Sequence, residues 1–176
     1  SKTITATALM QLFEDGLFSL EDDIDSYLPF NVNHPDYPLT PITFKMLLTH
    51  TSGIKDNWNV MPYYEGDSDL ELGYYLEQYL NPGGQFYNSN SNFTDSTPGT
   101  YYNYSNIGSA LIGFLVQEIS NQQFNDYCHE NIFEPLSMDN TYWFLSEIND
   151  IDQIALPYES MGGGAYVDDC SGDGDC

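Results

Sequence analysis

The chain has 176 residues, 41% of them hydrophobic, with 27 acidic side chains, three lysines and a formal net charge of −24. This apolar content suffices to bury the core of one domain or a large part of one, which excludes a disordered chain. The charge excludes nucleic acid as a partner, because binding it requires clustered lysine or arginine, and it disfavours an anionic membrane surface. It favours a solvated acidic surface suited to salty surroundings, with specific cation binding as the alternative.

Three cysteines bear on compartment and cofactors. Cys170 and Cys176 lie six positions apart in an acidic, glycine-rich tail, where a disulfide would close a small loop and indicate an oxidising compartment. Cys128 would be a buried thiol or would pair outside the chain. No Cys-x-x-Cys spacing is present, and we predict no metal and no other cofactor. The four aspartates of residues 168–176 leave calcium as an alternative to the disulfide-closed loop, although their spacing does not fit an EF-hand.

Neither a membrane-spanning segment nor a signal peptide is visible in the sequence. No apolar run approaches the roughly 20 residues that a spanning helix requires. The chain opens on Ser1 rather than on methionine and stops in a glycine-rich stretch, so we expect it to be truncated at both ends. The sequence makes no prediction of oligomeric state.

Helical periodicity marks the first part of the chain. Apolar residues at three- and four-residue spacing predict an amphipathic helix over residues 3–15, which ends at Gly16. A second short helix is predicted over residues 19–28, with Ser19 as its N-cap and acidic residues in its first turn. Pro29 ends this helix.

The middle of the chain alternates loops and short helices. Residues 31–42 hold three prolines and two asparagines and predict a loop. Thr43 is the predicted N-cap of a helix over residues 44–48, and a further helix is predicted over residues 69–80. Residues 81–103 predict a long loop rich in polar and aromatic residues.

The last part of the chain contains the clearest helix. Residues 105–120 carry an apolar stripe behind Ser105 or Asn106 as the N-cap. Less regular features are predicted after it: a short helix over 122–131, strands over 141–145 and 151–156, and an irregular tail over 162–176.

Three places in the sequence are candidates for chemistry. Lys2 lies in the first turn of a helix, where the positive helix end disfavours a cation and favours a neutral, basic amine, although a surface lysine is the alternative. Tyr104 and Asn106 lie at a loop-to-helix junction, where a hydroxyl and an amide can face a cleft, unless Tyr104 is only one more packed tyrosine. The segment 47–54 (LLTHTSGI) holds a serine and a histidine. A hydroxyl-rich turn is the favoured interpretation of this segment, and a catalytic pair is the alternative.

The order of these landmarks resembles a known family. Ser-Lys-Thr at a helix start, then Leu-Leu-Thr-His-Thr-Ser-Gly, then Pro98-Gly99 and Tyr104-Ser105-Asn106, is similar to the serine β-lactamase and penicillin-binding-protein (DD-peptidase) family, class C branch. The resemblance implies an α+β fold in which helices back an antiparallel sheet. Residues 1–176 would form a partial domain that holds most of the helical subdomain and little of the sheet.

The resemblance also implies roles for individual residues. The family's nucleophile is the serine of a Ser-x-x-Lys motif. Lys2 matches the motif lysine, and Ser1 matches only a spacer, so the position of the serine precedes this chain. Tyr104 and Asn106 match the Tyr-x-Asn motif. Lys2 and Tyr104 would move the proton of the attacking serine to the leaving group, and Asn106 would bind the substrate amide.

We therefore expect a serine hydrolase that forms an acyl-enzyme with a β-lactam, an ester, or a D-amino-acid amide or peptide. The nucleophile serine and the third family motif, Lys-Thr-Gly or His-x-Gly, both have no match within these 176 residues, which alone are therefore expected to be inactive. The family implies a periplasmic or secreted location. Two alternatives stay open. One is a non-catalytic relative that binds peptide or peptidoglycan, and the other uses Ser1 as an N-terminal nucleophile.

Overall fold

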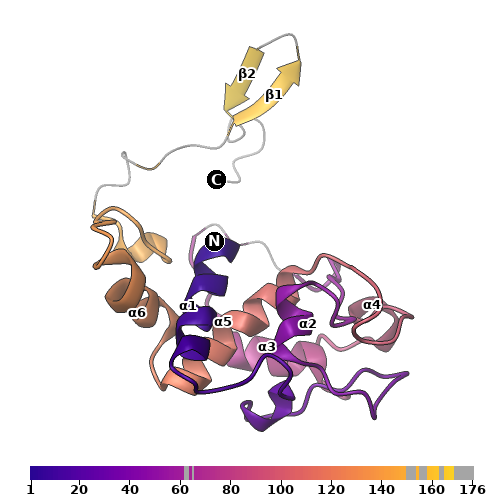
Figure 1. Cartoon of the computed structure of the whole chain (residues 1–176). Coiled ribbons are helices and arrows are strands. Elements are labelled where there is room, and N and C mark those ends of the chain that lie inside the picture. The colour runs from indigo at the N-terminus through magenta and orange to yellow at the C-terminus, as the bar shows by residue number, and fades with distance from the viewer. Residues whose placement is uncertain (62–63, 65, 150–153, 155–157, 163–164, 169–176) are drawn as a thin grey trace. The chain divides into compact units, whose positions relative to one another are not determined.

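The computed structural model describes residues 1–61, 64, 66–149, 154, 158–162 and 165–168 (Figure 1). The chain divides into two compact units. The first unit comprises residues 1–62 and 70–141, and the second comprises residues 63–69 and 142–176.

The first unit is helical, and one helix forms its centre. α5 (Asn106–Ser120) packs against α1, α2, α3 and α6 (Figure 1). These four helices are α1 (Lys2–Glu14), α2 (Phe44–Leu48), α3 (Leu72–Leu80) and α6 (Phe124–Cys128). The unit also contains the short helix α4 (Ser89–Asn92). Two single turns complete the unit, a 3₁₀ turn at Ile24–Ser26 and a π turn at His129–Phe133.

The sequence of α5 explains its central place. It is apolar on most of its circumference, and the side chains of Leu111 and Leu115 are completely buried. Fully burying such a side chain stabilises the fold by about 1.5–3 kcal/mol. Ser105 begins the helix, since its Oγ accepts a hydrogen bond of 2.9 Å from the Gly108 amide, and Asn121 ends it in the left-handed conformation with φ 56°.

The second unit contains a hairpin and a turn. β1 (Tyr158–Gly162) pairs with β2 (Ala165–Asp168) in antiparallel register, with an irregularity between Ser160 and Gly162. The 3₁₀ turn Leu145–Glu147 is fixed from within the same unit, because the Asp67 carboxylate accepts hydrogen bonds of 2.7 and 2.9 Å from the Leu145 and Ser146 amides.

Several predicted helices are confirmed. The helices predicted over residues 3–15, 44–48 and 105–120 correspond to α1, α2 and α5. Thr43 caps α2, since its hydroxyl accepts from the Met46 amide at 3.3 Å, and Gly16 follows α1 with φ 75°. The helix predicted over residues 69–80 begins later, at Leu72.

The helix predicted over residues 19–28 is wrong, and acidic side chains explain the difference. Asp22 accepts hydrogen bonds from the Ser19 amide at 2.8 Å and the Tyr27 hydroxyl at 2.7 Å, and Asp23 accepts from the Asp25 amide at 3.1 Å. Such local bonds compete with the helical ladder. Only the 3₁₀ turn at Ile24–Ser26 remains.

The less regular predictions need correction as well. The strand predicted over residues 141–145 is wrong, because Glu147 accepts hydrogen bonds of 3.2 Å from both the Trp143 and Phe144 amides and closes a turn there. The tail predicted to be irregular contains β2, and the helix predicted over 122–131 is α6 followed by the π turn. The loop predicted over 81–103 contains α4. Apart from Ile154, the strand predicted over 151–156 lies outside the described residues.

The described part of the chain is mostly helical, as predicted, whereas the α+β class of the complete fold stays a prediction. None of the helices described is both long and apolar enough to cross a bilayer.

Candidate active site

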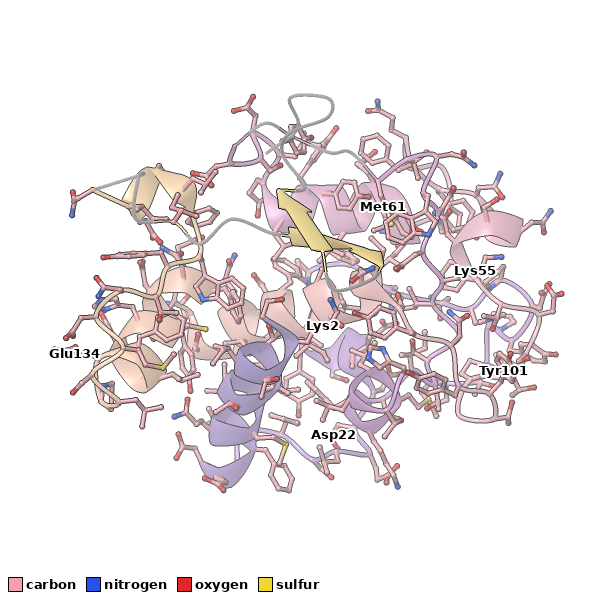
Figure 2. All side chains as sticks on the ribbon, turned by 90° about the horizontal axis from the view of Figure 1, so that it is seen from above. Lys2, Asp22, Lys55, Met61, Tyr101 and Glu134 are labelled. Carbon is pink, nitrogen blue, oxygen red and sulfur yellow. The ribbon has the colours of Figure 1, made fainter. Side chains whose placement is uncertain are left out.

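The structure brings Lys2 and Tyr104 together. Lys2 is the first residue of α1, and Tyr104 immediately precedes Ser105, the N-cap of α5. Because α1 packs along α5, the Lys2 Nζ lies 5.3 Å from the centroid of the Tyr104 ring. Figure 2 shows Lys2 at the N-terminal end of α1. The lysine is half-buried, and the tyrosine is 48% exposed. The amine therefore lies over the face of an aromatic side chain that is about half exposed to solvent.

Asn106 joins the same cluster. The Tyr104 hydroxyl donates to the Asn106 Oδ1 over 3.4 Å, so the two side chains of the Tyr-x-Asn motif are in contact. All three site residues predicted from the sequence thus lie within one cluster at the N-terminal ends of α1 and α5.

A fourth residue, Asp56, was not predicted from the sequence. Its Oδ1 accepts hydrogen bonds from the Ser105 Oγ at 3.0 Å and the Ile107 amide at 3.1 Å. Its Oδ2 accepts from the Asn106 amide at 3.0 Å and from the Asn106 Nδ2 at 2.7 Å. A carboxylate at this place also interacts favourably with the positive end of α5. The only sequence signal is a lone acidic residue after a turn, 50 positions before its partners.

His50 lies beside Tyr104 and holds the junction before α5. Its backbone is left-handed, with φ 54°, its carbonyl accepts from the Asn103 amide at 2.8 Å, and its Nδ1 accepts from the Ser105 amide at 3.3 Å. The ring lies 4.8 Å from the Tyr104 ring, measured between centroids. Burial, followed by the positive charge of Lys2, lowers the pKa of His50, which favours the neutral imidazole that this hydrogen bond requires.

The rest of the segment 47–54 is a structural turn. Ser52 is buried, and its hydroxyl accepts from the Ile54 amide at 3.3 Å, which supports the hydroxyl-rich turn over a catalytic pair with His50. Gly53 adopts φ 82°, and a Cβ there would lie only 2.8 Å from the His34 Cδ2. Only glycine fits this approach.

No group of three or more His, Cys, Asp or Glu side chains in the described part of the chain is placed to hold a metal ion. Cys128 is buried. Residues 169–176, with Cys170, Cys176 and most of the acidic tail, lie outside the described residues, so the disulfide and the calcium site stay predictions.

Comparison with protein families identifies the chain. Residues 1–168 match the model of the Beta-lactamase family. The chain belongs to the Beta-lactamase family. The family resemblance stated from the sequence is confirmed, and its class C branch stays a prediction.

Several curated proteins resemble the chain along most of its length. The chain is 28% identical to the lovastatin esterase of Penicillium rubens, over 95% of this chain and 46% of that protein. It is 26% identical to penicillin-binding protein 4* of Bacillus subtilis, over 90% of this chain and 33% of that protein. The chain spans about a third to a half of the length of the curated relatives it matches.

Solved structures show the same Beta-lactamase-family fold. The D-amino acid amidase from Ochrobactrum anthropi SV3, in complex with L-phenylalanine amide, superposes with a TM-score of 0.66 at 26% identity, over 93% of this chain and 42% of that chain. The octameric penicillin-binding protein homologue from Pyrococcus abyssi superposes with a TM-score of 0.64 at 24% identity, over 95% of this chain and 36% of that chain.

Proposed function

We propose that the protein is a serine hydrolase that forms an acyl-enzyme with a β-lactam, an ester, or a D-amino-acid amide or peptide. The observation that carries the proposal is the Lys2 Nζ over the Tyr104 ring at 5.3 Å, with Asn106 in contact with the Tyr104 hydroxyl. The names of the relatives, which include an esterase and an amidase, support the range of substrates.

An amine and a phenol in this arrangement suit proton transfer. The serine of a Ser-x-x-Lys motif lies one helical turn before its lysine, so an attacking hydroxyl at that position would face Lys2 and Tyr104. Together the two groups would accept the serine proton and deliver it to the leaving group. Asn106 would hold the substrate amide. The position three residues before Lys2, where this serine would stand, is not among the 176 residues. The mechanism requires no metal or other cofactor. A periplasmic or secreted location is part of the same proposal.

The test compares Tyr104→Phe with wild type in the protein expressed from its complete reading frame. The acylation rate with a fluorescent penicillin or an activated ester should fall by about 10²- to 10⁴-fold, because a proton-transfer group is lost. Tyr101→Phe is the matched control, since Tyr101 is 58% exposed and lies well apart from Lys2 in Figure 2. An unchanged rate for Tyr104→Phe would remove Tyr104 from the mechanism.

Two further outcomes bear on the alternatives. A wild-type protein that binds peptide or peptidoglycan but is never acylated would be a binding protein rather than an enzyme. The 176 residues alone should take no label from a fluorophosphonate, and stoichiometric labelling of Ser1 or Ser52 would place the nucleophile inside this chain.

A further inference from the structure

The carboxylate of Asp56 accepts a hydrogen bond from the side-chain amide of Asn106. An ionised carboxylate only accepts hydrogen bonds, so the group that faces it must be a donor. The shortest of the four hydrogen bonds to Asp56 comes from the Asn106 Nδ2, at 2.7 Å. With the nitrogen of the amide held there, its oxygen is left for the Tyr104 hydroxyl, at 3.4 Å.

We infer that Asp56 is a positioning residue that sets the orientation of Asn106 toward Tyr104 and the substrate. This inference rests on the proposed function, because it assigns a task to Asp56 only if Tyr104 and Asn106 act on a substrate. Asp56 itself does not touch the Lys2 amine or the Tyr104 ring through any of its four hydrogen bonds.

The segment that carries Asp56 is fixed on both sides by a buried polar network. The Lys55 amide donates to the Asn92 carbonyl at 2.8 Å, and the Asn57 Nδ2 donates to the Asn92 Oδ1 at 2.9 Å. The Tyr79 hydroxyl accepts from the Asn57 amide at 2.8 Å and donates to the Lys55 carbonyl at 2.7 Å. Burial raises the pKa of Tyr79, so this hydroxyl keeps the proton that it donates. The carboxylate is therefore held in place before any substrate arrives.

Helix capping does not account for all of these contacts. Ser105 already caps α5 through the Gly108 amide, and the bond from the Asn106 Nδ2 satisfies no backbone group of the helix. Glu71 offers the internal comparison. Among the residues that the structure describes, its two carboxylate oxygens accept from backbone amides alone, those of Gly73 and Tyr74, each at 3.0 Å, at the start of α3.

The experiment measures the acylation rate constant of Asp56→Asn and of the matched control Glu71→Gln, in the protein expressed from its complete reading frame. The probe is a fluorescent penicillin or an activated ester, mixed at saturation and followed through the first turnover. Each substitution turns one carboxylate at a helix N-terminus into an amide. Misplacing Asn106 should lower the rate constant of Asp56→Asn by about tenfold to a hundredfold, whereas Glu71→Gln should stay within about twofold of wild type.

The first-turnover curve separates positioning from folding. A loss of folded protein lowers the amplitude of the curve and leaves its rate constant unchanged, whereas a misplaced Asn106 lowers the rate constant. Asp56→Glu, which keeps a carboxylate that only accepts, should recover much of the rate that Asp56→Asn loses.

The outcomes distinguish this inference from the proposed function. If wild type is acylated and Asp56→Asn reacts at the same rate constant, or Asp56→Glu is as slow as Asp56→Asn, the inference is overturned and the function stands. If wild type is acylated by neither class of probe, the proposed function itself fails.

Discussion

The imidazole of His34 is fully buried, yet both of its nitrogens have backbone partners. The Nε2 lies 2.9 Å from the Thr94 carbonyl oxygen and must donate, and the Nδ1 accepts from the Asp36 amide at 3.3 Å. The neutral ring satisfies both bonds in one tautomer, whereas a protonated ring would lose the acceptor. Burial lowers the pKa of His34, against the opposing effect of the Thr94 carbonyl and the nearby acidic residues Asp36 and Asp95.

A pH dependence of stability follows from His34. Between its lowered pKa in the folded protein and the ordinary value of about 6.5, the unfolded chain binds more protons, so the free energy of unfolding falls as the pH is lowered through this window. Urea titrations from about pH 7 to pH 5.5 should show the fall, with His50 adding to it for the same reason. His34→Gln should flatten the slope, and His129→Gln, at an exposed ring, should keep it. An equal slope in both variants would contradict the prediction.

At the scale of elements, a buried polar network joins α3 and α4 to the segment 55–57. Asn92, at the end of α4, donates from its Nδ2 to the carbonyls of Tyr79 and Phe86 at 2.9 and 2.8 Å, while its Oδ1 accepts from Asn57. The hydroxyl of Tyr79, from α3, lies between the backbone of Lys55 and that of Asn57. Each buried polar group named here has a partner, which is the condition for such a network to specify a single arrangement.

Tyr79→Phe tests the contribution of this network. Removing the hydroxyl leaves a buried amide at Asn57 without its partner, which should lower the free energy of unfolding by about 1–3 kcal/mol. Tyr74→Phe is the control on the same helix, because Tyr74 is 45% exposed, and it should change stability by less than about 0.5 kcal/mol. Urea unfolding followed by circular dichroism measures both. Equal losses in the two variants would show that the network does not stabilise the fold.

The elements that could be predicted from the sequence are those with local signals. α1, α2 and α5 have regular apolar spacing and a cap or a glycine at an end, and these features lie within a few residues of the helix they define. The helix predicted over 19–28 failed because Asp22 and Asp23 bond to their own segment, which periodicity does not register. Within the site, Lys2, Tyr104 and Asn106 were found through motif order. Asp56 was missed because its partners lie 50 residues away and are set by tertiary structure.

At the scale of the whole molecule, the net charge of −24 opposes compaction. Lys45 forms an ion pair of 2.7 Å with Glu21, and both side chains are more than half exposed, so this pair contributes little. Lys55 donates to the Asn90 carbonyl at 3.1 Å, and Lys2 lies over Tyr104. With so few cations, self-repulsion is offset mainly by solvent and counterions.

The melting temperature should therefore rise with ionic strength. Raising the salt from about 0.1 to 1 M shortens the screening length from about 10 to 3 Å, which weakens repulsion among exposed carboxylates. Calorimetry in NaCl and in KCl should give the same rise if screening is the cause. A rise confined to one cation would favour the alternative of specific cation binding, and no rise would contradict the role assigned to the net charge.

The turn at Ser52 and Gly53, which packs against the His34 ring, bears on how hydrolases can be told from other proteins with the same fold. Gly53 is required by the His34 ring packed against it, and the buried Ser52 hydroxyl accepts from the Ile54 amide, so both residues serve the structure of the turn. A relative with the same architecture and without the proposed activity should therefore keep Ser52 and Gly53, because the turn is needed in either case. A genome survey that searches for hydrolases with the proposed mechanism should therefore filter on the residues at positions 2 and 104, and treat Ser52-Gly53 only as a marker of the shared fold.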